Sequence, residues 1–169
     1  EELGMKADSK TIGINKSFLV NTYYPLYYHF FSRIGLRVLV SELSEQEGID
    51  RQRAPFCYPA EISHGFSFNL LKKKPDYLFL PQLKGVYVES GDKKSITCPL
   101  SQGEPYYLSS AFKDLETFRN LKAVGRIMMP VIDFSEGYES AENAFVSMAK
   151  KLGCRKKVAR GAFFEAIKI

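Results

Sequence analysis

The chain has 169 residues, and its 45% hydrophobic and 14% aromatic content argues against disorder and suffices for one domain with its own core. Lys and Arg outnumber Asp and Glu by 24 to 19, but the basic clusters contain no interleaved aromatic residues, which argues against a nucleic-acid partner. No apolar stretch reaches the roughly 18 residues of a membrane span, and three widely spaced cysteines do not form a secreted disulfide framework. We therefore expect a cytoplasmic protein that contacts neither nucleic acid nor membrane.

The start of the chain bears on its domain organisation. Residues 1–6 resemble neither a signal peptide nor a natural translation start. We interpret residues 1–9 as a linker remnant and residues 10–169 as a single α/β domain. The chain is then expected to be a fragment of a larger multidomain protein.

The first half of the chain alternates short apolar runs with amphipathic segments. Residues 11–14 form an apolar run that ends in the polar segment 15–17, which is typical of a buried strand. Pro25 suits the first turn of a helix, and apolar residues then recur at helical spacing until Gly35. Similar patterns predict a strand over 36–40, a short helix or loop over 44–52, a helix over 60–74 and a strand over 76–80.

The second half continues the alternation. The turn residues Gly91 and Asp92 separate two short apolar runs, so a hairpin or an irregular excursion is expected between residues 86 and 97. Glu104 and Pro105 are expected to begin a helix that runs to about residue 122. The remaining patterns predict a strand over 126–134 interrupted at Pro130, and helices over 141–152 and 155–169.

Strands that alternate with helices of about 10 to 15 residues indicate parallel βαβ units. We therefore expect an α/β fold, a three-layer sandwich around a mostly parallel, Rossmann-like sheet of four to five strands. In such sheets ligands bind outside the carboxyl ends of the strands, an edge we call the rim. The segments expected there are 15–17, 81–82 and 98–99, and Cys57 joins them if an extended segment precedes it.

Two cysteines, Cys57 and Cys98, lie in turns close to prolines, near the ends of predicted strands. Backbone N–H groups and the helix dipole stabilise a thiolate in a turn at a helix start, which favours metal or iron–sulfur ligation. The alternative is that both side chains are small apolar groups packed in turns. Two thiols alone do not name a cofactor. Cys154, which follows a predicted helix end, has no matching partner and is expected to be structural.

Other side chains near the predicted rim are candidates for binding. His64 either orients a thiolate or a bound group, or is hydrogen-bonded to a nearby loop. Its neighbour Gly65, inside a predicted helix, indicates close backbone approach to another helix or to a ligand. Lys16 follows the first strand, where a phosphate or CoA group could bind, and Tyr58, next to Cys57, completes the candidate binding set.

Independent catalysis is not expected from this sequence. Glu61 and Asp133 are the only carboxylates that the pattern places near the rim, and such groups are more often solvated or capping. Two histidines do not assemble a Ser-His-acid triad, and Gly13 alone matches neither a P-loop nor a dinucleotide-binding fingerprint. Hydrolase activity and autonomous use of ATP are therefore not predicted.

A series of short motifs resembles a known family. The motifs are Ile12-Gly13-Ile14, Tyr23-Tyr24-Pro25, Phe30-Phe31, Gly35-Leu36-Arg37-Val38, Cys57-Tyr58-Pro59-Ala60, His64-Gly65, Asp76-Tyr77-Leu78-Phe79-Leu80-Pro81 and Cys98-Pro99. In this order they resemble the domain of unknown function found in 2-hydroxyacyl-CoA dehydratase activase-related proteins, which are similar to 2-hydroxyglutaryl-CoA dehydratase activators. The resemblance covers residues 11 to about 149, and Cys-Tyr-Pro-Ala followed by His-Gly is its most specific part.

The resemblance implies a cytoplasmic, often anaerobe-associated multidomain protein, in which ATP-hydrolysing activase domains of the actin/Hsp70 type accompany this domain. In that system ATP hydrolysis drives an electron to a dehydratase [4Fe–4S] cluster, which enables removal of water from a 2-hydroxyacyl-CoA. The resemblance places cluster-type thiols at Cys57 and Cys98, and a third just after Pro81, where this chain has Gln82. Glutamine is not a usual iron–sulfur ligand, so this member has either lost the cluster or completes it from elsewhere.

The leading hypothesis is a domain of an activase-related protein that is non-catalytic alone and associated with ATP-driven electron transfer through iron–sulfur clusters. Cys57 and Cys98 are then vestigial or partial ligands of a [4Fe–4S] cluster. One alternative is an acyl-CoA-binding part of a dehydratase-like enzyme, with Lys16 and His64 lining the pocket, and another is a docking domain without a cofactor. The expected partners are the ATP-binding activase domains of the parent protein, a dehydratase subunit or acyl-CoA.

Overall fold

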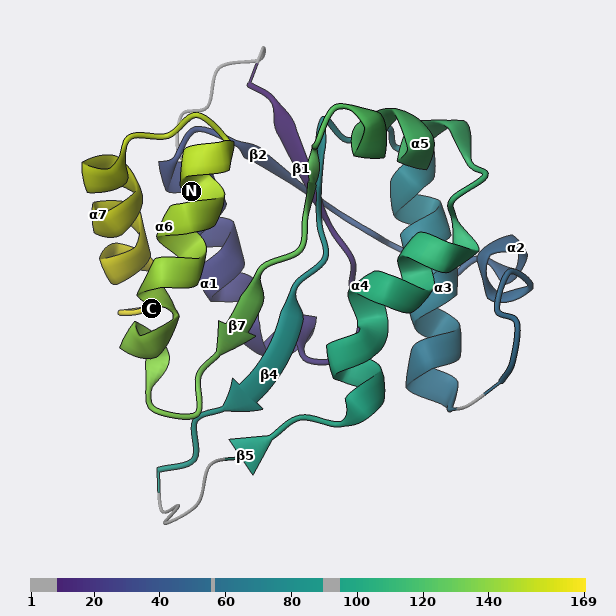
Figure 1. The fold of residues 1–169 in the computed structure, drawn as a ribbon, viewed down its shortest axis with the longest axis horizontal. Helices are drawn as coiled ribbons and strands as arrows, with labels where there is room; N and C mark the ends of the chain where they lie inside the picture. The colour runs from purple at the N-terminus through teal and green to yellow at the C-terminus, as the bar shows by residue number, and fades with distance from the viewer. Residues whose placement is uncertain (1–8, 56, 90–94) are drawn as a thin grey trace.

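The computed structural model describes residues 9–55, 57–89 and 95–169 (Figure 1). Its helices are α1 (Val20–Arg33), α2 (Gln46–Ile49), α3 (Tyr58–Lys72), α4 (Pro99–Ala111), α5 (Glu116–Ala123), the short 3₁₀ helix η1 (Tyr138–Ala141), α6 (Glu142–Lys151) and α7 (Lys156–Ala166). Its strands are β1 (Thr11–Ile14), β2 (Arg37–Val40), β3 (Tyr77–Phe79), β4 (Gln82–Val86), β5 (Ser95–Ile96), β6 (Ile127–Met128) and β7 (Val131–Asp133). The linker expected over residues 1–9 stays a prediction, because residues 1–8 lie outside the described part.

Four strands form a parallel sheet in the order β2-β1-β3-β6. The central strand β1 is buried along its whole length, and its Ile12 pairs with Val38 of β2 on one side and with Tyr77 of β3 on the other. After β1 the chain forms α1 and β2 on one side, and it then returns through α3 to β3 on the other side. The mostly parallel sheet expected from the sequence is confirmed.

Helices cover both faces of this sheet (Figure 1). On one face Ile12, Ile14 and Phe79 share a core with α1, α6 and α7. On the other face Leu78 and Leu80 pack with α3, α4 and α5. Successive strand residues point to opposite faces, so one short apolar strand supplies both cores. The three-layer α/β sandwich is therefore confirmed.

A second, three-stranded sheet in the order β5-β4-β7 continues from the first and was not expected. The chain passes from β3 to β4 through Pro81 and from β6 to β7 through Pro130. The Gln82 amide donates to the Pro130 carbonyl at 2.9 Å, so the two strands stay hydrogen-bonded where they change sheets. Proline has no N–H for a ladder. The interruption predicted at Pro130 is confirmed, and Pro81 adds a matching one.

The second sheet contains a hairpin, one of the two alternatives expected for this segment, but its first strand β4 ends at Val86, where the expected hairpin began. Strands β4 and β5 are antiparallel, with Gly85 opposite Ile96. The turn expected at Gly91 and Asp92 lies outside the described residues. Asp133, predicted near the rim, lies in β7 and forms an ion pair with Lys84 at 3.1 Å, so it belongs to the second sheet.

Two predicted helix starts are wrong. Helix α1 begins at Val20 rather than near Pro25, and α4 begins at Pro99 rather than at Glu104. In both helices a proline therefore lies inside, where it removes one backbone hydrogen bond. Burial of the apolar face of each helix offsets that loss. The long helix expected to reach residue 122 is divided into α4 and α5 by residues 112–115.

Candidate functional site

The rim lies where the strand order of the parallel sheet reverses. Strand β1 ends between β2 and β3, and open α/β sheets bind ligands at such a reversal. Three segments that are distant in sequence meet there. Asn15 follows β1, and its Nδ2 lies 3.3 Å from the Ser63 carbonyl of α3 and 2.9 Å from Oε1 of Glu104 in α4.

The two candidate thiols lie at the starts of two helices that pack against each other. Cys57 is the N-cap residue of α3 and Cys98 that of α4, and each helix has a proline in its first turn. Cys57 is half-buried and Cys98 is exposed. Burial raises the pKa of the Tyr107 hydroxyl, and the nearby Glu104, Cys57 and Cys98 raise it further, while a hydrogen bond with Ser63 opposes the increase. Both thiols therefore lie within electrostatic reach of one hydroxyl group, so the structure brings them to the same rim.

Glu104 is a buried carboxyl group behind the thiols, with 6% of its surface exposed. Its Oε1 accepts hydrogen bonds from Asn15 Nδ2 at 2.9 Å, from Ser63 Oγ at 2.7 Å and from Ser17 Oγ. Burial raises the pKa of Glu104, and these three donors offset only part of that effect. We call Asn15, Ser17, Ser63 and Glu104 the Glu104 cluster. It ties β1, α3 and α4 together.

Sequence reasoning missed Glu104 because it placed this residue at a helix start, where a carboxylate is normally solvated. The available signal was that Ser101, Glu104 and Leu108 share one helical face, and all three are buried. Next to the carboxyl, Asn15 Oδ1 is buried and forms no hydrogen bond with any described residue. Buried polar atoms are normally paired, so this oxygen leaves the cluster with unused hydrogen-bonding capacity.

His64 and Gly65 of α3 have separate roles. His64 is buried, and its Nδ1 donates to the Ala60 carbonyl at 2.7 Å, within its own helix. Burial lowers the pKa of His64, although this hydrogen bond opposes the effect, so the ring is neutral at pH 7 and its Nε2 is an acceptor. A Cβ atom on Gly65 would fall 2.8 Å from the Glu45 amide nitrogen at the start of α2. The close approach predicted at Gly65 is therefore to another helix.

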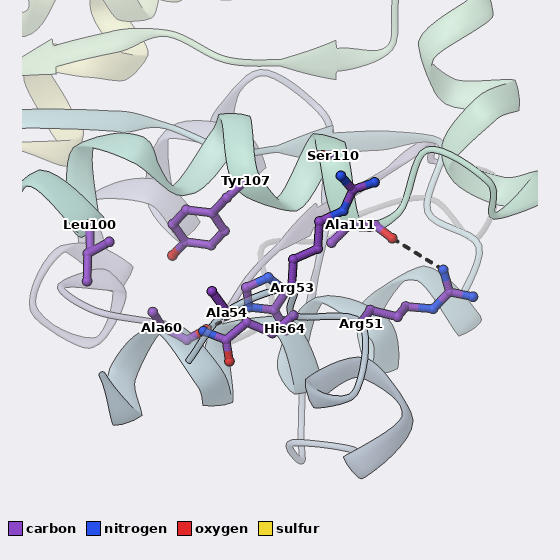
Figure 2. A pocket seen from close by; sticks show the side chains of 10 residues that line it. Arg51, Arg53, Ala54, Ala60, His64, Leu100, Tyr107, Ser110 and Ala111 are labelled. Atoms are coloured by element: carbon purple, nitrogen blue, oxygen red, sulfur yellow. Dashed lines mark hydrogen bonds between the residues drawn. The ribbon is translucent and has the colours of Figure 1, made fainter. Parts of the chain in front are cut away.

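A cavity of about 250 Å³ lies between α3, α4 and residues 51–54, and we call it the α3–α4 cavity (Figure 2). The His64 ring stacks on the Tyr107 ring beside it, with centroids 5.1 Å apart. Arg51 is held by Asp114 at 2.7 Å and by the Ala111 carbonyl at 3.2 Å. The described residues that line the cavity are Arg51, Gln52, Arg53, Ala54, Ala60, His64, Leu100, Tyr107, Ser110 and Ala111.

A larger cavity of about 720 Å³, the Lys16 cavity, is lined by residues after β1 and by the starts of α3 and α4. Among the described residues that line it, Lys16 alone carries a charge, and Cys98 is also in its wall. The structure thus brings Lys16 and Cys98 to one cavity and His64 to the other. Tyr58 is 71% exposed and lines neither of these two cavities.

Comparison with known proteins places almost the whole chain in one family. Residues 11–169 match the family described as the CoA enzyme activase uncharacterised domain. The chain belongs to this family. Neither the curated proteins nor the solved structures gave a significant match. Within the described ranges, no helix combines the length and the apolar character needed to cross a membrane.

A [4Fe–4S] cluster is held by three or four thiolates, and this requirement can be compared with the rim. Within the described part of the chain, no group of three His, Cys, Asp or Glu side chains is arranged to hold a metal ion. Gln82 follows Pro81 and accepts a hydrogen bond from the Tyr106 hydroxyl at 3.1 Å. Cys57 and Cys98 are thus two thiols without a third described ligand. The described residues do not fit a complete cluster by themselves.

Proposed function

We propose that this domain serves ATP-driven electron transfer in an activase-related protein, and that Cys57 and Cys98 form a two-thiol half-site for an iron–sulfur cluster. The remaining ligands come from another domain or chain. The domain is not catalytic alone and acts in the cytoplasm, next to ATP-binding activase domains or a dehydratase subunit. Membership of the family described as the CoA enzyme activase uncharacterised domain supports this role.

The observation that carries the proposal is the placement of the two thiols. They belong to the N-cap residues of two helices that pack together, and both lie near the Tyr107 hydroxyl. Helix N-termini favour anionic groups, which suits thiolate ligands. Cys98 is exposed and Cys57 half-buried, so a ligand-donating partner can approach the pair from outside.

Anaerobic reconstitution with iron and sulfide tests the half-site, with iron counted per chain and the charge-transfer absorbance recorded. The reconstitution is run on this chain alone and together with ATP-binding activase domains. We expect iron in the wild type in at least the second case, and none above background in the Cys57→Ser, Cys98→Ser double variant. Cys154→Ser is the matched control and keeps the wild-type iron content. Equal iron in the wild type and the double variant in both experiments would contradict the proposal.

The Lys16 cavity favours a second function, binding of acyl-CoA. Its volume of about 720 Å³ lies within the usual range for small-molecule sites, and its single charged group is a cation that suits a phosphate. Cys98 in the same wall would lie beside the bound thioester.

Calorimetry with an acyl-CoA tests this second function. We expect the dissociation constant to rise about tenfold in Lys16→Ala, the size of one charge-assisted hydrogen bond. Lys113→Ala, an exposed lysine of the α4–α5 connection, is the control and leaves binding unchanged. Absence of heat at millimolar acyl-CoA would remove this function and leave the half-site proposal untouched.

A further inference from the structure

We propose that the α3–α4 cavity is a binding site for a small apolar carboxylate, whose chain fills the cavity while its carboxylate pairs with Arg53 at the mouth. This site is separate from the Lys16 cavity and does not depend on the proposed electron-transfer role. The ligand class follows from the size of the cavity, from its lining and from the contrast between its two arginines.

The size of the cavity sets the size of the ligand. An engineered protein cavity of about 150 Å³ binds benzene, so about 250 Å³ has room for an apolar chain of about five carbons or more, as in hexanoate. The walls that would contact this body are the side chains of Ala54, Ala60, Leu100 and Ala111 and the ring of Tyr107. An apolar body gains free energy from leaving water for such walls.

The polar groups of the lining set the ligand's orientation. The inner end of the cavity has neutral His64, whose Nδ1–H is already used by the Ala60 carbonyl. Its Nε2 is an acceptor and would repel a carboxylate. Arg53, in contrast, lies at the exposed mouth. Among the described lining residues there is no carboxylate that would oppose an anion. The carboxylate is therefore expected at the mouth and the apolar body inside.

The two arginines of the cavity differ in their partners. Arg51 is fixed by Asp114 at 2.7 Å and by the Ala111 carbonyl, and its guanidinium lies over the Phe112 ring at 5.9 Å. Arg53 has no ion pair with any described residue, and Figure 2 shows its side chain extending across the cavity toward Ser110. Arg51 thus builds the wall, while Arg53 retains its charge for a ligand. A guanidinium pairs with a carboxylate through two parallel hydrogen bonds.

Occupancy of this cavity would also affect the rim. The Tyr107 ring forms part of the cavity wall, while its hydroxyl lies near Glu104 and both thiols. A ligand against this ring therefore contacts the side chain that separates the cavity from the Glu104 cluster.

Amide-resolved NMR titration of the chain with hexanoate, hexanamide and inorganic phosphate tests the site. We expect hexanoate to shift the amide signals of His64, Leu100 and Ala111 and to bind about tenfold more tightly than its neutral isostere hexanamide, with no response to phosphate at these residues. Equal binding of hexanoate and hexanamide, or shifts confined to other parts of the chain, would overturn the proposal.

Matched variants separate the two halves of the site. Arg53→Gln is expected to abolish the preference for hexanoate over hexanamide, whereas Arg119→Gln, an exposed arginine of α5, keeps it. Ala111→Leu fills the cavity from the helix, and Ala54→Leu fills it from the exposed loop. Each variant is expected to lower the affinity for hexanoate and for hexanamide at least tenfold. Ala54→Leu keeps the test decisive if Ala111→Leu fails to fold. Unchanged hexanoate binding in a folded filling variant would refute the assignment.

Discussion

The interior and the outer edge of the rim differ in burial and in hydrogen bonding, although less than two turns of α4 separate them. Glu104 is buried and accepts three hydrogen bonds, whereas Cys98 at the start of the same helix is exposed. The interior cluster joins β1 to α3 and α4, so it holds the two helix starts at a fixed separation. The difference indicates that the buried polar groups position the rim, while the thiols remain available to a partner.

The largest expected effect on stability comes from a substitution that forces α2 away from α3. Gly65→Ala places a Cβ within 2.8 Å of the Glu45 amide nitrogen and against Ser44 Oγ. We expect the free energy of unfolding to fall by about 1–3 kcal/mol, the usual cost of overpacking. Gly103→Ala is the control, because its new Cβ meets only Tyr107 at 3.9 Å, and it is expected to stabilise α4 by about 0.5–1 kcal/mol. Denaturant unfolding measures both, and equal values for the two variants would contradict this packing.

Removing a hydrogen-bond donor from the Glu104 cluster changes the interior of the rim and not its outer edge. Ser63→Ala deletes the hydroxyl that lies 2.7 Å from Glu104 Oε1. We expect a loss of about 1–2 kcal/mol, because a buried acceptor loses one of its donors. Ser110→Ala, an exposed serine of the same rim helix α4, should change stability by less than about 0.5 kcal/mol. An unchanged free energy of unfolding in Ser63→Ala would show that the cluster does not contribute to stability.

The charge of Glu104 gives a smaller effect that depends on pH. Burial raises its folded-state pKa above the unfolded value, so its favourable contribution is complete below the unfolded pKa and is lost as pH rises through the folded pKa. Glu104→Gln keeps an acceptor for the three donors without the charge. The variant should therefore be more stable than the wild type at pH 7, and the gain should vanish near pH 4. Exposed Glu116→Gln is the control, and a gain that is constant with pH would contradict the assignment.

The smallest effect on stability is expected at the outer edge. Cys98→Ser should change the free energy of unfolding by less than about 0.5 kcal/mol, because the side chain is exposed. In the wild type, iodoacetamide should label Cys98 before Cys154, since burial raises the pKa of the Cys154 thiol. Mass spectrometry of a labelling time course measures the order. Faster labelling of Cys154 would remove the distinction between an open rim thiol and a structural one.

Local patterns were enough to predict most of the fold. The apolar run at 11–14 and the amphipathic pattern at 141–152 correspond to β1 and α6 within a residue or two. The prediction is correct for these segments because burial of one or two faces produces a regular spacing of apolar residues in the sequence. Pro25 and Pro105 misled the prediction, since a helix interior tolerates proline when tertiary packing stabilises the rest of the helix. The break at residues 112–115 has no comparable signal.

The site was less predictable than the fold, because its members depend on contacts between distant segments. Cys57 could be placed near a helix start from the proline that follows it, whereas Cys98 was expected in a turn well before the helix start predicted at Glu104. Glu104 shares a helical face with Ser101 and Leu108, but its hydrogen-bond partners Asn15 and Ser63, which are 89 and 41 residues away, leave no local signal. The α3–α4 cavity is likewise formed by a loop and two helices, and the local sequence pattern does not predict how far apart these three segments lie.

The chain crosses from the first sheet to the second at Pro81 and again at Pro130, and the strand register is continuous across these two crossings. The Leu80 amide bonds to the Met128 carbonyl and the Gln82 amide to the Pro130 carbonyl, so one continuous ladder crosses from the first sheet to the second. A one-residue insertion before Pro81 would therefore not stay local. It would exchange the inward and outward positions of β4, turning Leu83 toward solvent and Lys84 toward the core. Gln82 would then lose its hydrogen bond with Tyr106 of α4. The register of the strands in the core therefore also determines which side chain of β4 faces α4.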